Sequence, residues 1–264
     1  MSQSNKQYTL IGINKSEHHP LLKGLSIMAG HNKWSQIKHK KAKEDSKRGK
    51  AFTKLIKEII VSAKDGGGDP SGNAHLRQLI DKAKHINMPQ ENITRAIKRG
   101  TGELAGVHYE PHTYEGYGPN GIAVIVETLS DNKNRTVADL RQLFSKNNGN
   151  LGESGSVSWM FKKMGVIRGT SDATEDALLE SLIEHGVDDL KKDGTYVSIL
   201  CDPKSLDHVK KAINPADMKV EHAELEWVAQ QHTELSDEQS DKAVQFLSAI
   251  EDHDDVQNVY TTLA

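Results

Sequence analysis

The spacing of apolar residues changes at Gly100, and this change constrains the fold of the 264-residue chain more than any other feature. Before Gly100, apolar side chains recur every three or four residues, which is the period of helices that bury one face. After Gly100 they alternate, which is the period of half-buried strands. The two patterns predict an α+β fold, and the length allows two or three domains at roughly 100–150 residues each.

Three short helices are expected before Gly100. The first ends at the glycine-rich segment 66–70, the second runs over 73–86, and the third begins at Pro89 and ends at Gly100. Segment 66–70 lacks the Lys-Ser/Thr pair and the preceding strand of a P-loop, so we expect a turn between helices. The three apolar faces predict a small bundle with a basic arm in front of it.

The alternating pattern after Gly100 predicts a sheet. The expected elements are strands at 109–117 and 121–129, a hairpin turn at 116–121, a helix at 134–146 and a strand at 156–161. Near the end, Ser236 and Gln239 form a capping box for a helix, and a strand covers 256–260. A lone terminal strand would expose an unpaired edge, so we expect it to join the sheet that begins at residue 109.

Residues 164–227 have the order strand, helix, strand, strand, helix, strand, which is the ferredoxin-like arrangement. The predicted organisation is therefore a basic helical domain, an α/β domain, and a ferredoxin-like (βαββαβ) domain inserted into it. The domain bounds are 28–106 for the first, 107–162 with 228–264 for the second, and 163–227 for the third. Residues 1–27 show no hydrophobic period and are expected to be a disordered extension, or to precede the true start at Met28.

Charge is unevenly distributed along the chain, although the formal total is only −3. Residues 28–100 carry 17 Lys and Arg against seven Asp and Glu, whereas residues 101–264 carry 14 against 29. A basic segment attracts polyanions and an acidic one repels them. The N-terminal part is therefore the part expected to bind nucleic acid.

The basic arm is the first candidate contact, because ten cations stand against three anions between Met28 and Glu58. Each phosphate that such residues neutralise releases condensed counterions. The residues predicted to bind nucleic acid here are Lys33, Trp34, Lys38, Lys40, Lys41, Lys43, Lys47, Arg48, Lys50, Lys54 and Lys57. Trp34 is predicted either to stack on an unpaired base or to pack on the helical bundle.

A second basic cluster consists of Arg95, Lys98 and Arg99, which share one helix face. In one interpretation they extend the nucleic-acid-binding surface. In the other they stabilise the dipole at the C-terminus of their helix.

Composition argues against several classes of function. The single cysteine, Cys201, excludes a disulfide framework and a cysteine-rich zinc site. No stretch approaches the roughly 20 apolar residues of a membrane span. The histidines form no clear ligand set, and no catalytic triad can be assembled. We expect a cytoplasmic protein without catalysis, metal, cofactor, small-molecule substrate or membrane contact.

Long blocks of the sequence resemble the YebC/PmpR family, whose relatives include the mitochondrial translational activator of cytochrome oxidase subunit I. The matching blocks are MAGHNKWSQIKHKKAKEDSKRGKAFTKLIKEI (28–59), GGGDP (66–70), NMPQENITRAIKRGTGE (87–103), YEGYGPNGIAVIVETLSDNKNRT (114–136), GNLGESGSVSWMF (149–161) and EDHDDVQNVY (251–260). The resemblance covers essentially all of 28–264. It implies three domains, in agreement with the apolar periods, and no enzymatic activity.

The resemblance implies a DNA-binding transcriptional regulator as the first hypothesis. The second is a ribosome-associated translation factor that binds RNA and assists synthesis through proline runs. A third hypothesis, from another class, is a protein–protein adaptor that uses the acidic ferredoxin-like domain. A steep loss of affinity with salt distinguishes the first two from the third.

Overall fold

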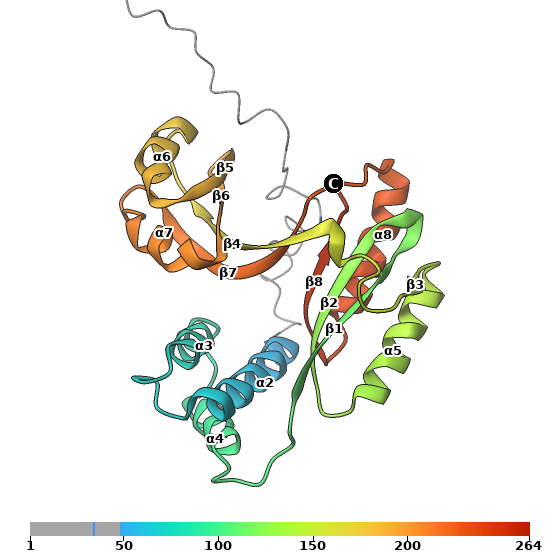
Figure 1. Ribbon diagram of the computed structural model, residues 1–264. Coiled ribbons are helices and arrows are strands. Elements are labelled where there is room, and N and C mark those ends of the chain that lie inside the picture. Colours follow the sequence, from blue (N-terminus) through green and yellow to red (C-terminus); the bar gives the residue numbers. More distant parts are fainter. Residues whose placement is uncertain (1–33, 35–47) are drawn as a thin grey trace, which may run out of the picture.

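The computed structural model describes Trp34 and residues 48–264, whose elements form three packed groups (Figure 1). Three helices make up the first group, and each of the other two contains a four-stranded sheet. The α+β class expected from the sequence is therefore confirmed. Within the described part of the chain, no helix is long and apolar enough to cross a membrane.

The helical group consists of α2 (Arg48–Gly66), α3 (Ala74–His85) and α4 (Gln90–Gly100). The apolar stripes form its core, with Leu55, Ile59, Leu76, Ile93 and Ala96 among the buried side chains. Segment 66–70 is the turn between α2 and α3, as expected. Pro89, predicted as the first residue of this helix, is its N-cap residue, and α4 begins one position later at Gln90.

Gly100 allows α4 to cross α2 at close range. A Cβ at this position would lie 2.4 Å from the carbonyl oxygen of Ile60 and 2.7 Å from the Cβ of Ala63. Backbone cannot move aside as a flexible side chain can, so the crossing requires glycine. This contact brings the C-terminal ends of α2 and α4 together.

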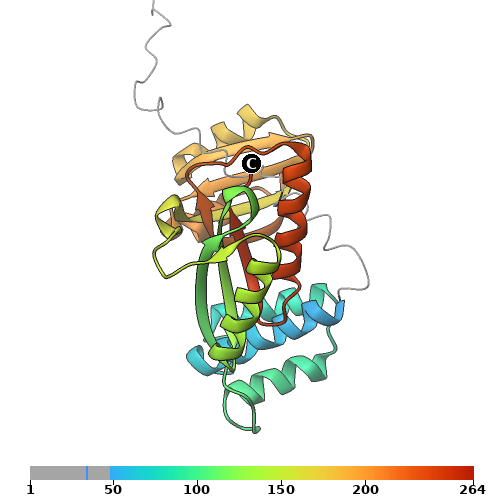
Figure 2. The ribbon, with the colours of Figure 1, turned by 90° about the vertical axis from the view of Figure 1, so that its right-hand side faces the viewer.

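The first sheet has the strand order β3-β1-β2-β8, and its neighbouring strands are antiparallel. Its strands are β1 (Glu110–Tyr117), β2 (Ala123–Ser130), β3 (Asn150–Leu151) and β8 (Val256–Thr261). Helices α5 (Lys133–Lys146) and α8 (Asp237–Glu251) cover one face, as Figure 2 shows. Phe144 of α5 and Phe246 of α8 meet edge to face with ring centroids 5.0 Å apart. The predicted capping box at Ser236 is present.

The strand predicted at 156–161 is wrong. This stretch is a loop followed by the short 3-10 turn η3 (Ser158–Met160), and strand β4 begins only at Phe161. The carboxylate of Glu115 accepts hydrogen bonds from the backbone nitrogens of Val157 and Ser158 at 2.8 Å each. Because those donors bind a side chain, they cannot take part in a strand ladder.

The second sheet has the strand order β5-β6-β4-β7 and is antiparallel throughout. Its elements are β4 (Phe161–Thr170), α6 (Glu175–Leu182), η4 (Ile183–His185), β5 (Val187–Asp193), β6 (Tyr196–Cys201), η5 (Pro203–Ser205), α7 (Leu206–Ala212) and β7 (Lys219–Ala229). This is the ferredoxin-like order expected from the sequence. Cys201 is buried in this group, where burial raises the pKa of its thiol to about 11.

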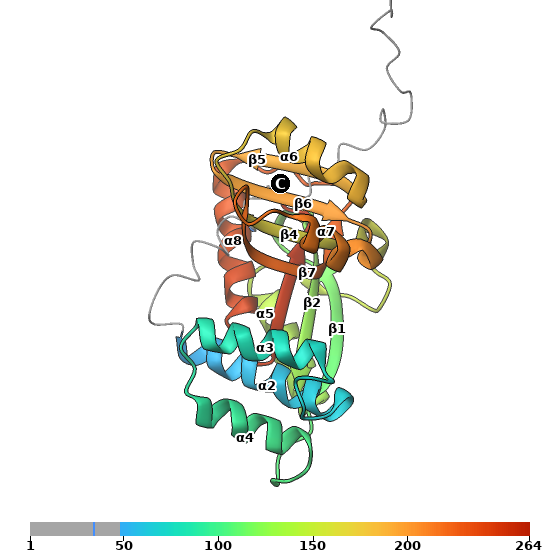
Figure 3. The ribbon, with the colours of Figure 1, turned by 90° about the vertical axis from the view of Figure 1, so that its left-hand side faces the viewer.

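The chain leaves the first sheet after β3, forms the whole second sheet, and returns through α8 to β8, which pairs with β2. The edge strand β7 of the second sheet lies nearest to the helical group (Figure 3). We propose that the three groups correspond to the domains predicted at 28–106, at 107–162 with 228–264, and at 163–227.

Candidate nucleic-acid interface

Some residues of the predicted interface lie within the part of the chain that the structure describes, and others lie outside it. Most of the basic arm lies outside the described residues, namely Lys33, Lys38, Lys40, Lys41, Lys43 and Lys47. Arg48 is the first residue of α2. The structure therefore bears on Trp34, on three lysines of α2, and on the cluster of α4.

Trp34 is buried rather than available for stacking. Its exposed fraction is 2%, and it packs in the core of the first sheet with Ile122, Val124 and Val259. Its indole nitrogen donates to the carbonyl oxygen of Val259 at 3.3 Å. Base stacking by Trp34 is incompatible with this position. The alternative prediction, packing on the helical bundle, is wrong as well, because Trp34 packs in the core of the first sheet, which the local sequence does not identify.

Three lysines of α2 point toward the C-terminal end of α8. The Nζ of Lys50 donates to the carbonyl oxygen of Asp252 at 3.1 Å, and the Nζ of Lys54 donates to that of Glu251 at 2.7 Å. Carbonyl groups at a helix C-terminus carry partial negative charge, so cations there are stabilising. The excess of cations that predicted a phosphate contact thus includes lysines that lie against a neighbouring element of the same chain.

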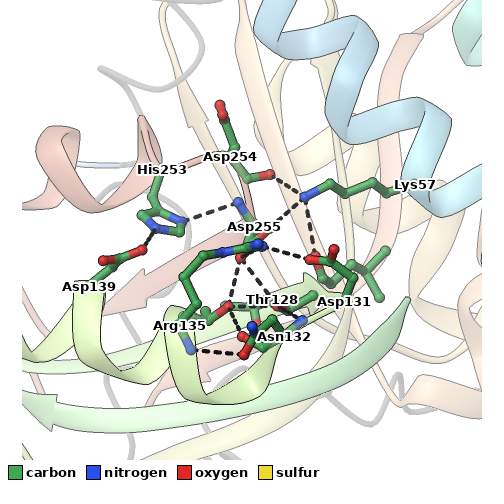
Figure 4. A network of polar contacts seen from close by, with 12 residues as sticks. Lys57, Thr128, Asp131, Asn132, Arg135, Asp139, His253, Asp254 and Asp255 are labelled. Atoms are coloured by element: carbon green, nitrogen blue, oxygen red, sulfur yellow. Dashed lines mark hydrogen bonds and ion pairs between the residues drawn. The ribbon is translucent and has the colours of Figure 1, made fainter. Parts of the chain in front are cut away.

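Lys57 is the most deeply placed of the three, with a side chain 8% exposed. Its Nζ lies 2.6 Å from Oδ1 of Asp255 and donates to the carbonyl oxygen of Asp254 at 3.0 Å (Figure 4). It also lies 5.2 Å from the centroid of the Tyr109 ring. A lysine enclosed in this way is not available to a phosphate, so the prediction for Lys57 is wrong in this arrangement.

Asp255 is the centre of the network in Figure 4. Its Oδ2 accepts from the hydroxyl of Thr136 at 2.6 Å, the guanidinium of Arg135 at 3.2 Å and the hydroxyl of Ser130 at 3.2 Å. Burial alone would raise the pKa of Asp255, but the hydrogen bonds from Lys57 and Thr136 hold it at about 2. This carboxylate joins α2, α5 and the end of β2.

The cluster on α4 has a different environment. Arg95, Lys98 and Arg99 are all exposed, and Arg95 forms an ion pair with Glu91 one turn earlier on the helix. At the close crossing, the backbone of Lys64, near the end of α2, lies next to Gly100 of α4. Lys64 and Arg99 both line a groove of about 290 Å³.

Apolar side chains form the mouth of this groove, where Leu104 is 42% and Val107 is 50% exposed. Lys64, Arg95, Lys98 and Arg99 are defined here as the α4 surface. It presents cations outward at one end of the molecule, which fits a polyanion. Sequence reasoning identified three of its members and missed Lys64, whose approach to α4 depends on the helix crossing.

A larger cleft of about 690 Å³ lies between the three groups. On its wall, Arg168 binds Glu226 with both terminal nitrogens, at 2.6 and 2.8 Å. Burial alone would raise the pKa of Glu226, but the charge of Arg168 outweighs it and holds this pKa well below its ordinary range. Lys82 of α3 reaches Glu224 of β7 at 3.1 Å. These pairs stabilise the packing of the second sheet, and Lys82 links it to the helical group.

No group of three His, Cys, Asp or Glu side chains that could hold a metal ion occurs among Trp34 and residues 48–264. The sequence also gave no signal for Glu115 and Tyr117 of β1 and Trp159 of η3, whose side chains form hydrogen bonds to the backbone of the loop before β4. Tyr117 and Trp159 are 38% and 64% exposed.

Two family models match the chain. The TACO1/YebC protein N-terminal domain matches residues 32–103, and the TACO1/YebC second and third domain matches residues 109–263. These spans include the helical group and both sheets.

Curated relatives match almost the whole of both chains. A probable transcriptional regulatory protein of Chlorobium luteolum is 52% identical over 239 residues, covering 89% of this chain and 95% of the relative. One of Geobacter sulfurreducens is 51% identical, covering 88% and 94%. The crystal structure of a conserved hypothetical protein from Aquifex aeolicus is 43% identical and superimposes with a TM-score of 0.78, covering 87% of this chain and 95% of that one.

Proposed function

The chain belongs to the TACO1/YebC family, and from this membership we propose that it is a non-catalytic regulator of gene expression that acts by binding nucleic acid. The relatives at 51–52% identity carry the name probable transcriptional regulatory protein, so a transcriptional regulator that binds DNA is the first candidate. We place its site of action in the cytoplasm.

One observation carries the proposal: some cations of the helical group face another part of the chain, and others face the solvent. Lys50, Lys54 and Lys57 contact the end of α8, whereas the α4 surface presents its cations to solvent. Residues 101–264 carry 29 acidic side chains against 14 basic ones. A polyanion is therefore attracted to the helical end of the molecule and repelled by most of the remainder. Lys33, Lys38, Lys40, Lys41, Lys43, Lys47 and Arg48 extend the proposed contact along the chain.

A ribosome-associated RNA-binding translation factor is the second candidate. Phosphate contacts position a nucleic acid without specifying its sequence, so the α4 surface suits RNA as well as DNA. The exposed aromatic side chains of Tyr117 in β1 and Trp159 in η3 favour this candidate, because unpaired bases are common in folded RNA.

Charge reversal tests the proposal. We expect Lys98→Glu with Arg99→Glu to weaken binding to a labelled DNA duplex and to a structured RNA. The slope of log affinity against log salt should decrease by about two, one for each lost phosphate contact. The matched control is Lys210→Glu with Lys211→Glu, because these lysines also occupy the last turn of an exposed helix.

The control separates a local contact from a general effect of net charge, since both double variants change the charge equally. Equal losses in the two variants would contradict a contact at α4. A wild-type protein whose weak binding is insensitive to salt would contradict the nucleic-acid proposal as a whole.

A further inference from the structure

Tyr117 and Trp159 are two exposed aromatic side chains that come from different elements. Tyr117 is the last residue of β1, and Trp159 lies in η3, 42 positions later. Their exposed fractions are 38% and 64%. A single exposed aromatic side chain is common on protein surfaces, so exposure alone indicates little. The way in which these two are held is the informative feature.

Both polar atoms of the pair bind the same acceptor. The hydroxyl of Tyr117 donates to the carbonyl oxygen of Ser156 at 3.3 Å, and the indole nitrogen of Trp159 donates to it at 3.1 Å. The hydrogen-bond donors of both rings are therefore already used. What the rings still offer to a partner is their apolar faces and edges, which suit stacking rather than hydrogen bonding.

Glu115 fixes the loop that provides this acceptor. It is 6% exposed, and its carboxylate accepts from the backbone nitrogens of Gly155 at 2.9 Å and of Val157 and Ser158 at 2.8 Å. Burial alone would raise the pKa of Glu115, but the three donors outweigh it and lower this pKa. Four consecutive residues around Ser156 are thus organised by one buried charge, and the rings are positioned before any partner binds.

The residues that neighbour the pair in the sequence or across the strand pairing are polar and include exposed cations. Lys162 follows Trp159 by three residues, and Asn150 is the strand partner of Tyr117. Lys146 and Asn148 precede Asn150 and are also exposed. Glu153 is the exposed carboxylate of the same loop. Lysines flanking exposed aromatic rings are the combination that single-stranded nucleic acids use, with stacked bases and neutralised phosphates.

We propose that Tyr117 and Trp159 form a stacking platform for unpaired nucleic-acid bases. This inference rests on the proposed function, and it adds that the ligand contains a single-stranded region. Bases in an intact duplex are already stacked on one another, so the platform discriminates against double-stranded ligands. The α4 surface contributes affinity through phosphates, and the platform contributes preference for unpaired bases.

Replacing Trp159 tests the platform directly. The probes are a single-stranded oligo(dT), an oligo(U) RNA, an abasic strand of equal length, and a DNA duplex. We expect Trp159→Ala to reduce affinity for oligo(dT) and oligo(U) by roughly 5- to 150-fold. Affinity for the abasic strand and the duplex should be unchanged, because neither presents an unpaired base. A difference between oligo(dT) and oligo(U) shows which of these two strands the platform prefers.

Ile183→Ala is the matched control, because Ile183 is another large apolar side chain, 57% exposed, on a different group. It should leave all four affinities at the wild-type level. Thermal melting of both variants verifies that the fold is retained. Trp159→Phe, which keeps a smaller ring, should fall between wild type and Trp159→Ala.

Unchanged oligo(dT) and oligo(U) affinities in Trp159→Ala would overturn the platform, and the exposed rings would then be a protein contact. An equal loss on the abasic strand would also overturn it, because the effect would not depend on bases. If Lys98→Glu with Arg99→Glu still weakens binding in either case, the proposed function is retained and only the platform is rejected. Failure of wild type to bind any probe removes both proposals.

Discussion

Two sets of cations in the same helical group have opposite environments. Lys50, Lys54 and Lys57 recur along one face of α2 and contact the end of α8 and the turn after it. Lys98 and Arg99 end α4 and remain exposed. Both sets belong to the basic segment 28–100, and the sequence predicted both as contacts to nucleic acid. The difference shows that helical spacing determines which cations share a face, but not what that face meets.

Trp34 and Trp159 show the same contrast between a side chain that contacts the rest of the chain and one that is exposed. Trp34 lies among cations in the sequence and is buried, whereas Trp159 lies outside the basic segment 28–100 and is 64% exposed. The basic neighbours of Trp34 made it the candidate stacking residue in the sequence, with packing as the alternative. The structure favours Trp159, because exposure and a fixed ring are what stacking needs.

Replacing the buried tryptophan should have the largest effect on stability. We expect Trp34→Ala to lower the free energy of unfolding by about 3–5 kcal/mol, because it empties a large site in the first sheet's core. Trp159→Ala should change it by less than about 0.5 kcal/mol. Urea denaturation of both variants measures the two values. Similar values for the two tryptophans would contradict the division between them.

Breaking the buried ion pair should have the next largest effect. We expect Lys57→Met to cost about 3 kcal/mol, at the lower end for a buried pair because Arg135 still contacts Asp255. Lys98→Met, at an exposed position, should cost less than about 0.5 kcal/mol. Denaturation of Lys57→Met, of Asp255→Asn and of the double variant gives the coupling energy, and Lys98→Met is the exposed control. A negligible coupling would show that Lys57 is not held by Asp255.

Lowering the pH should weaken the same ion pair, with a smaller effect on the free energy of unfolding. Because the pKa of Asp255 is lowered from its ordinary value of 3.8 to about 2, its contribution to stability is complete above pH 3.8. That contribution is lost as the pH falls toward 2. The stability difference between wild type and Asp255→Asn should therefore shrink from pH 5 to pH 2.5 in urea titrations. A difference that stays constant over this range would contradict the shifted pKa.

Local pattern predicted most elements of the fold. The elements of the second sheet follow the predicted ferredoxin-like order, α8 begins after the expected capping box, and β8 joins the first sheet, as the edge argument required. These features depend on apolar period, capping chemistry and unpaired edges, which short segments encode. The strand prediction for 156–161 failed because Glu115, some 40 positions earlier, accepts hydrogen bonds from backbone nitrogens of this stretch.

The candidate site was less predictable for the same reason. Lys57 faces Asp255, which is 198 positions away, and Lys64 lines the same groove as Arg99 because α2 and α4 cross closely at Gly100. Net charge located the basic end of the molecule correctly in sequence. Which of its cations are free depends on long-range contacts that composition and spacing do not record.

The most direct test compares the two sets of cations in one binding experiment. Lys50→Gln with Lys54→Gln removes two charges from the docked face, and Lys98→Gln with Arg99→Gln removes two from the exposed one. We expect the second variant to lose affinity for a labelled nucleic acid, with a salt slope reduced by about two, and the first to bind like wild type. Loss of affinity in the Lys50 and Lys54 variant alone would contradict the division of the basic helices into a docked face and a nucleic-acid-binding face.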